Sequence, residues 1–216
     1  MAERSGQFRV YRVTESVPHI NLQAVDSATL YTVYQTGYGD LQEQVDELVT
    51  GDLVTATLAG DPAAEEEPWR IQRLERAGGV EMGFAVDIQP PDVARETWTA
   101  DATAPLSTVL SEDDTAVGAC VVQPRDPLPD GAFVPSVLTG LLPLEEQLDS
   151  VSGVEEPAAE ALFLDPDPTD ARSFSTPYGV ALLFTERGRS LADRFRGQYD
   201  CPRGTETRPD FDPYGL

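Results

Sequence analysis

Residues 29–48 read TLYTVYQTGYGDLQEQVDEL and change from a strand pattern to a helix pattern within one short stretch. The segment Thr29–Thr36 is rich in β-branched and aromatic residues, which suit a pleated sheet. Apolar residues then recur at Leu41, Val45 and Leu48, the spacing of one face of a helix. The stretch therefore predicts one short helix that follows directly on a strand.

Further strands are expected on both sides of this helix. Gln7–Thr14, Ile20–Val25 and Leu53–Ala59 are rich in apolar and β-branched residues. A hairpin is expected from Trp69–Arg76 and Val80–Ile88 around Gly78-Gly79, because the second arm alternates apolar and charged residues. The order of strands, one helix and more strands resembles an OB-fold, a small Greek-key barrel. An SH3-like barrel fits nearly as well.

The sequence predicts an α+β protein with an N-terminal small β-barrel followed by a mixed α/β layer. The barrel is expected over residues 1–88 and the α/β domain over residues 105–216. Residues 89–104 are expected to be a linker, because Pro90 and Pro91 cannot continue a strand ladder.

Short buried strands and helices are expected in the second domain. The predicted strands are Thr115–Val122, Ala159–Leu164 and Tyr178–Phe184. Helical spacing from Val137 to Leu148 is interrupted by Pro143, which predicts two short helices. A last helix is expected from Thr185 to about Tyr199.

The composition points to an acidic surface. The chain has no lysine, and its 15 basic residues are all arginines against 38 Asp and Glu, for a formal charge of -23. Such an excess suits concentrated salt, where the Debye length falls to roughly 3 Å and like charges cease to repel. With the acidic loop Asp61–Pro68, this composition resembles small uncharacterised cytoplasmic proteins of haloarchaea.

The expected compartment is the cytoplasm. The first ten residues carry charges and no apolar signal-peptide core, and no apolar run approaches the ~20 residues that span a bilayer. No membrane partner is therefore expected. Cys120 and Cys201 are the two cysteines, and in a reducing compartment they are expected to stay unpaired.

Few routes to catalysis are open to this sequence. His19 is the one histidine, which excludes two-histidine metal sites, and Asp165, Asp167 and Asp170 lack the glycine and glutamate of an EF-hand loop. No phosphate-binding glycine motif is present. The sequence therefore predicts no catalytic residue, metal site or cofactor. Carboxylate chemistry, such as glycoside hydrolysis, stays open because it needs only two acids.

Two groups of arginines are the candidate binding residues. Six of the 15 arginines lie between Arg187 and Arg208, and at 100° per residue they do not form one stripe. Pairing with the acids of the same protein is expected for most of them, with an RNA or acidic-partner surface as the alternative. The named candidates of this group are Arg187, Arg194 and Arg203.

The second group lies in the predicted barrel, where Trp69 adjoins Arg70, Arg73 and Arg76. Period two places Arg70 and Arg76 on one face and Arg73 on the other. Arginine and aromatic residues on a small barrel suit single-stranded nucleic acid. Trp69, Arg70 and Arg76 are the candidates here, and core packing is the competing interpretation for the aromatics, including Tyr31 and Tyr34.

The expected function is a non-enzymatic binding or adaptor protein with a protein partner of unknown identity. The first alternative is a single-stranded RNA-binding accessory protein, and the second is a carboxylate-based hydrolase. A subunit of a larger assembly is also open, with Phe133–Leu148 as its contact. The sequence leaves the oligomeric state undetermined.

Overall fold

The computed structural model describes residues 2–12, 17–64 and 67–211, which form two five-stranded sheets and several short helices. The expected α+β class is confirmed. Two compact units are present: one holds the chain up to Gly79 with Val137–Glu145, and the other holds Val80–Ser136 and the chain from Glu146 onward. The chain thus passes between the units three times. None of the helices in the described residues has the length and apolar character needed to cross a membrane.

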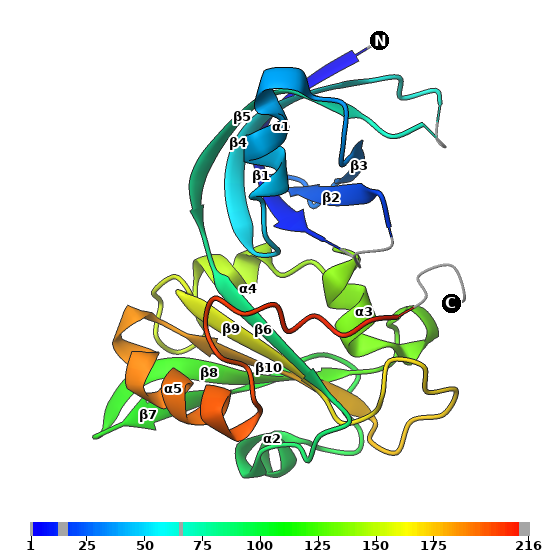
Figure 1. Ribbon diagram of the computed structural model, residues 1–216. Coiled ribbons are helices and arrows are strands. Elements are labelled where there is room, and N and C mark those ends of the chain that lie inside the picture. The colour runs from blue at the N-terminus through cyan, green and yellow to red at the C-terminus, as the bar shows by residue number, and fades with distance from the viewer. Residues whose placement is uncertain (1, 13–16, 65–66, 212–216) are drawn as a thin grey trace. The chain divides into compact units, whose positions relative to one another are not determined.

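The first sheet is antiparallel, with the strand order β3-β2-β1-β4-β5 (Figure 1). Its strands are β1 (Ala2–Tyr11), β2 (His19–Ala24), β3 (Leu30–Tyr34), β4 (Asp52–Gly60) and β5 (Arg70–Gly79). A 3-10 turn (Gly39–Leu41) and helix α1 (Gln42–Asp46) connect β3 to β4, as the change of period predicts. The expected end of the first strand at Thr14 lies outside the described residues.

The core of this unit follows from the alternation of apolar residues along its strands. One face of each strand is buried, and Val45 and Leu48 from α1 and the turn after it pack on the same cluster. The buried strand residues are Phe8, Val10, Ile20, Leu22, Val33, Val54, Ala56, Leu58 and Ile71. Because side chains alternate between faces, the residues between these positions lie on the outer face.

No closed barrel is found in the described residues, so the predicted barrel is not confirmed. The two edge strands of the first sheet do approach each other at one point. Val33 and Trp69 form an isolated parallel bridge, in which the Trp69 N–H donates to the Thr32 carbonyl at 2.8 Å and the Tyr34 N–H donates to the Trp69 carbonyl at 3.2 Å. The first sheet is therefore open except for this bridge.

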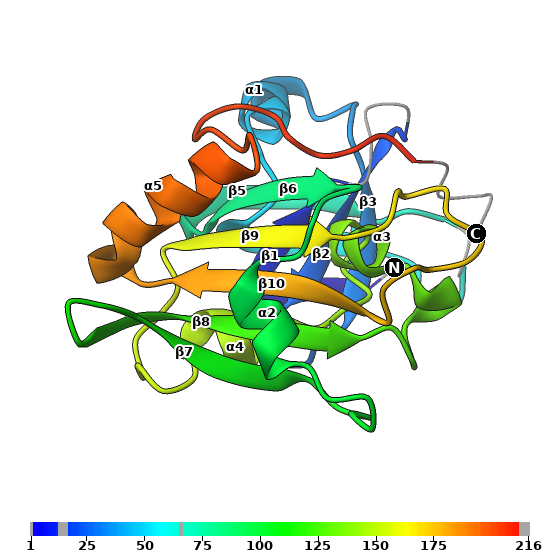
Figure 2. The ribbon, with the colours of Figure 1, turned by 90° about the horizontal axis from the view of Figure 1, so that it is seen from below.

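The second sheet has the strand order β6-β9-β10-β8-β7, which Figure 2 shows from one edge to the other. The strands are β6 (Glu81–Val86), β7 (Leu106–Glu112), β8 (Thr115–Pro124), β9 (Glu160–Asp165) and β10 (Tyr178–Phe184). The β6–β9 pair is parallel and the other pairs are antiparallel. β9 and β10 are buried along their whole length, which explains why β10 and the residues between Glu160 and Asp165 in β9 are apolar.

Helices cover both faces of the second sheet (Figures 1 and 2). Helices α2 (Asp92–Thr97) and α5 (Arg189–Gln198) share one apolar cluster with Cys120, Leu182 and Phe184. Helices α3 (Phe133–Leu138) and α4 (Glu145–Asp149) follow on the chain, and Phe133 lies 6.4 Å from Phe163 between ring centroids. The two short helices on either side of Pro143 confirm the prediction from its position.

Two expectations about the middle of the chain were wrong, and one open alternative, an exposed contact at Phe133–Leu148, does not fit the burial of this segment. β5 and β6 do not form a hairpin, because β5 pairs with β4 while β6 pairs with β9 in the other sheet. The expected linker contains α2, whose Ala94 is fully buried. Phe133–Leu148 is mostly core rather than exposed contact, although Leu141 is 56% exposed.

The two cysteines are free and buried, in agreement with the prediction that they stay unpaired. Burial alone raises the pKa of the Cys120 thiol to about 12. Burial also raises the pKa of Cys201, although Arg196 and the hydrogen bond to the Phe84 carbonyl act in the opposite direction. Both thiols are therefore protonated and inert near neutral pH.

Candidate functional site

The strongest candidate surface lies on the outer face of the first unit, beside the bridge between β3 and β5. Bridge residues Val33 and Trp69 place the next residues, Tyr34 and Arg70, side by side. The Arg70 guanidinium carbon lies 4.6 Å from the centroid of the Tyr34 ring. His19, opposite Tyr34 in the register of β2 and β3, lies 5.8 Å from that ring in an edge-to-face arrangement. Three planar groups thus gather at one place.

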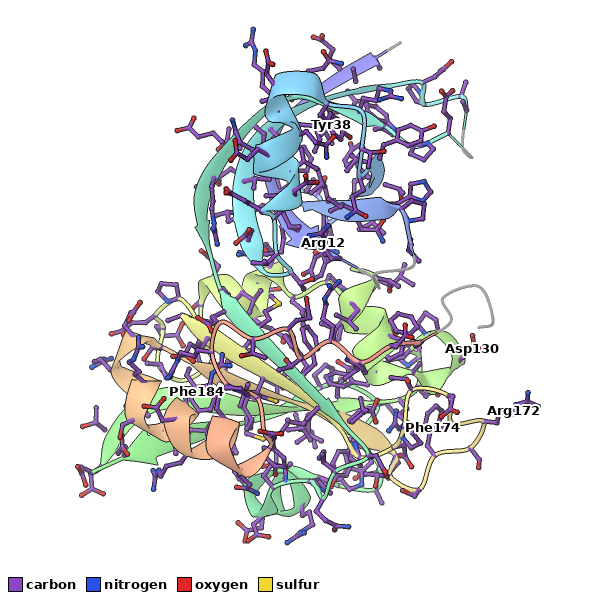
Figure 3. The ribbon with its side chains drawn as sticks, in the orientation of Figure 1. Arg12, Tyr38, Asp130, Arg172, Phe174 and Phe184 are labelled. Atoms are coloured by element: carbon purple, nitrogen blue, oxygen red, sulfur yellow. The ribbon has the colours of Figure 1, made fainter. Side chains whose placement is uncertain are left out.

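Tyr38 holds the backbone behind this surface. Its hydroxyl donates to the Tyr34 carbonyl at 2.7 Å and accepts from the Ile71 N–H at 3.5 Å. Burial raises the pKa of Tyr38, while the hydrogen bond from Ile71 and the charge of Arg70 lower it in part. Figure 3 labels Tyr38 beside α1. The hydroxyl stays protonated and ties β3 to β5 at the level of Tyr34 and Arg70.

A β-bulge changes which arginines share this outer face. The register of β4 and β5 shifts between Thr57 and Leu58, so that Arg70 lies opposite Ala59 and Arg73 lies opposite Thr57. An extra residue in one strand reverses the faces of all that follow. Arg70 and Arg73 therefore point outward together, and the expectation that they lie on opposite faces was wrong.

Arg76 falls on the inner-face register and contacts a buried acid. It lies opposite Val54 and forms an ion pair with Asp52, whose side chain is almost fully buried. Burial raises the pKa of Asp52, while the Val49 N–H and the Arg76 guanidinium oppose that shift. The sequence-predicted site is thus divided: Arg70 stays on the outer surface, and Arg76 neutralises a carboxylate.

Trp69 is half-buried and packs toward the core. Its ring lies 5.1 Å from the Tyr31 ring at an interplanar angle of 78°, and both side chains lie against the apolar cluster of this unit. Gly60 on β4 leaves room for the indole, because a Cβ there would collide with the ring. Tyr34, for which the sequence left core packing as the competing interpretation, is the outward-facing ring.

The C-terminal arginines lie in ion pairs within the second unit. Arg187 contacts Glu156 at 2.5 Å, and Arg194 contacts Glu112 at 3.1 Å. Arg203 binds Glu160 at 2.7 Å and also pairs with Asp193. These contacts agree with the expectation that most of these arginines pair with the protein's own acids. A ligand role for Arg187, Arg194 and Arg203 stays a prediction.

Part of the outer face of the first sheet is covered by the chain itself. The Asn21 side-chain amide donates to the Thr139 carbonyl at 2.8 Å, and that of Gln23 donates to the Gly140 carbonyl at 2.7 Å. Arg9 on β1 forms a buried ion pair with Glu145. These bonds hold Val137–Glu145 over β1 and β2, and they leave the Tyr34 end of β3 as the open part of the face.

The second unit contains a buried ionic cluster that the sequence did not reveal. Arg125 contacts Asp165 at 2.5 Å and Asp167 at 2.9 Å, and its guanidinium lies 4.0 Å from the Phe174 ring centroid. In Figure 3 Phe174 lies near the body of the unit and Arg172 points away from it. Forty residues separate Arg125 from Asp165, and no local pattern connects them.

Metal binding finds no support in the part of the chain that the structure describes. It contains no group of three or more His, Cys, Asp or Glu side chains placed to hold an ion. The Asp165 and Asp167 carboxylates, which superficially resemble a cation loop, are instead bound by Arg125.

The chain belongs to a family of unknown function (DUF6663), whose model matches residues 1–204. The match covers the first unit and most of the second. Comparison with curated proteins finds no match, and comparison with solved structures finds none either.

Proposed function

We propose that this protein is a non-enzymatic binding protein whose N-terminal unit binds single-stranded RNA at the outer surface formed by His19, Tyr34, Arg70 and Arg73. One observation carries the proposal. In a chain with 38 acids, Arg70 contacts no carboxylate among the described residues and lies instead over the ring of the partly exposed Tyr34. A stacked arginine and tyrosine offer a planar platform for a base and a cation for a phosphate.

The topology supports this choice of ligand. The antiparallel order β3-β2-β1-β4-β5, the helix between β3 and β4, and a parallel contact of β3 with the start of β5 are the features of an OB-like, partly open barrel. OB-folds bind oligonucleotides on the face around their second and third strands. His19 begins β2 and Tyr34 ends β3, so the proposed surface lies at one end of that face.

We also propose that the protein works in the concentrated cytoplasm of a halophilic archaeon. The net charge of -23 would repel RNA at low salt, and molar salt screens that repulsion within roughly 3 Å. Simple phosphate pairing loses its counterion-release gain under the same conditions. Stacking is less affected by salt, which favours a surface built on Tyr34 and Arg70 over one built on charge alone.

The test is a fluorescence titration with mixed-sequence RNA oligomers in about 2 M KCl, where screening is near its limit. Trp98→Phe removes emission from the second unit, where Trp98 packs on Tyr178 at 4.9 Å. Trp69, adjacent to Arg70, then reports binding. We expect saturable quenching, and Tyr34→Ala should weaken binding by about 1–3 kcal/mol, the contribution of one stacked base.

Arg172→Ala is the matched control for Arg70→Ala, because Arg172 is an exposed arginine of the other unit without a carboxylate partner among the described residues. Only the Arg70 variant should lose affinity. Raising KCl further should change the affinity little, whereas phosphate pairing alone predicts a slope of about -0.7 per contact. Absence of quenching at every RNA concentration would exclude this function.

A protein–protein adaptor is the second candidate, and one observation favours it. β7 is a sheet edge with no charge before Glu112, a feature that suits pairing with another polypeptide.

The hydrolase alternative gains no such support, because the buried carboxylates Asp52, Glu160, Asp165 and Asp167 each contact an arginine.

A further inference from the structure

The two sheets have four edge strands, and three of them are protected within the described residues. β3 and β5 meet at the bridge between Val33 and Trp69, and β5 also carries several exposed charges. The segment after α5 lies along β6: the Phe84 N–H donates to the Thr207 hydroxyl at 2.9 Å, and the Gly204 N–H donates to Glu81 at 2.9 Å. Natural proteins protect edges in these ways because an open edge recruits further strands.

β7 is the least protected of the four, although the Ser107 hydroxyl lies 3.2 Å from that of Ser152 and Gly153 lies against the Val109 side chain. Figure 2 shows it as the outermost strand of the second sheet, and its described backbone hydrogen bonds go to β8 alone. It has no proline, and residues 102–111 carry no charge. Val109 at its centre is 43% exposed. β7 ends at a tight turn through Asp113 and Asp114, both with positive φ, and its register with β8 shifts once, between Leu110 and Ser111.

We propose that β7 pairs with β7 of a second copy of this chain, antiparallel and centred on Val109. The two five-stranded sheets would then continue into each other across a two-fold axis. This pairing places Ser107 opposite Ser111 of the second copy and Thr108 opposite Leu110. The proposal concerns the second unit and does not depend on RNA binding.

The charge distribution favours a second copy as the occupant. Two chains that each carry -23 repel each other over most of their surfaces, and β7 offers a contact without like charges opposed. Glu112 would lie opposite Leu106 of the second copy, and it is already paired with Arg194 at 3.1 Å. An antiparallel two-fold contact is self-complementary, so one strand provides both halves of the interface.

The experiment measures mass by sedimentation and light scattering in about 2 M KCl, a salt that suppresses long-range repulsion. Wild-type protein should reach twice the mass of one chain as concentration rises. Val109→Lys puts two cations opposite each other and should raise the dimer dissociation constant at least about tenfold. Val49→Lys, at a valine that is 51% exposed in the other unit, should leave it unchanged.

A cysteine variant tests the register directly. Side chains directly opposite in an antiparallel pair have Cβ atoms about 4.5–5.5 Å apart, close to the spacing that a disulfide spans. Val109→Cys should therefore cross-link two chains on oxidation, while Val49→Cys should not. Buried Cys120 and Cys201 should not interfere. A monomer at all concentrations overturns the proposal, as does a dimer that neither Val109 variant affects.

Discussion

At the scale of single residues, the arginines act mainly as partners of buried and surface acids. Within the described residues, at least nine arginines contact a carboxylate, among them Arg125, which no lysine could replace. Its Nε donates to the Thr176 carbonyl at 2.7 Å and its Nη1 to the Gly131 carbonyl at 2.9 Å, while Nη2 binds both aspartates. The planar guanidinium of Arg125 donates to four acceptors, whereas the ammonium of a lysine would offer a single point charge.

The Arg125 cluster predicts a pH-dependent loss of stability. Burial acts to raise the pKa of Asp167, but the Ser175 and Thr176 N–H groups, the Ser175 hydroxyl and Arg125 outweigh it and lower the pKa below its ordinary value. A carboxyl with a lowered pKa stabilises the folded state above its unfolded pKa of about 3.9. That contribution is lost as pH falls toward the folded value.

Asp167→Asn should therefore reduce the free energy of unfolding by about 3 kcal/mol at pH 7, the lower end of the cost of breaking a buried pair. The difference from wild type should shrink as pH falls below about 4. Denaturant unfolding at several pH values in constant molar KCl measures it. Asp170→Asn, an exposed change in the same loop, is the control. A difference that does not vary with pH would contradict the ionic explanation.

At the scale of elements, local pattern predicted the strands but not their partners. The strand Tyr178–Phe184 has the predicted bounds, because its unbroken apolar sequence is itself the signal. β6 was expected to pair with β5, its neighbour along the chain, yet it lies parallel to β9, about 80 residues away. The alternation of apolar and charged residues in Val80–Ile88 would be the same whether this strand paired with β5 or with β9. Sequence period therefore gives an element its type and leaves its pairing open.

The residues of the candidate site could also be predicted only in part from the sequence. Arg70 and the tyrosines of β3 were visible as an aromatic and basic group in the sequence. Their meeting depends on the bridge of Val33 with Trp69 and on the bulge at Gln72, and neither feature alters the local residue pattern. Arg76 was placed on the wrong face for that reason. Long-range geometry decides which members of a sequence group share a surface.

The segment Val137–Glu145 gives a prediction at this scale. Gly140 has a φ of +74°, and a Cβ there would lie 2.9 Å from both Leu30 and Tyr11 side-chain carbons. Gly140→Ala should therefore cost about 1–3 kcal/mol of stability through overpacking, beyond the cost of the positive φ. Gly39→Ala is the control, since Gly39 has a φ of +56° and open space around its Cα. Equal thermal destabilisation of the two variants would show that the contact with β1 and β3 contributes nothing.

At the scale of the whole molecule, the excess of acids predicts that the stability of the fold depends on salt. The 38 acids outnumber the 15 arginines by more than two to one, and several arginines, such as Arg187, Arg194 and Arg203, are already engaged in ion pairs. Most carboxylates are therefore left without an arginine partner. Repulsion between unpaired charges weakens a compact state when it is not screened. The Debye length is about 10 Å at 0.1 M salt and roughly 3 Å at 1 M.

Salt should therefore decide whether the chain is folded. In molar KCl we expect one compact state with a cooperative melt, and in about 0.1 M KCl a much lower melting temperature or an unfolded chain. Circular dichroism across a KCl series measures this. The triple variant Glu43→Gln, Glu47→Gln and Asp101→Asn removes three exposed charges and should retain more of its melting temperature at low salt. If charge repulsion lowers the melting temperature at low salt, the decrease must become smaller as acids are removed. Two results would contradict this cause: a melting temperature that is the same in both salts, or a triple variant whose melting temperature depends on salt as strongly as that of wild type.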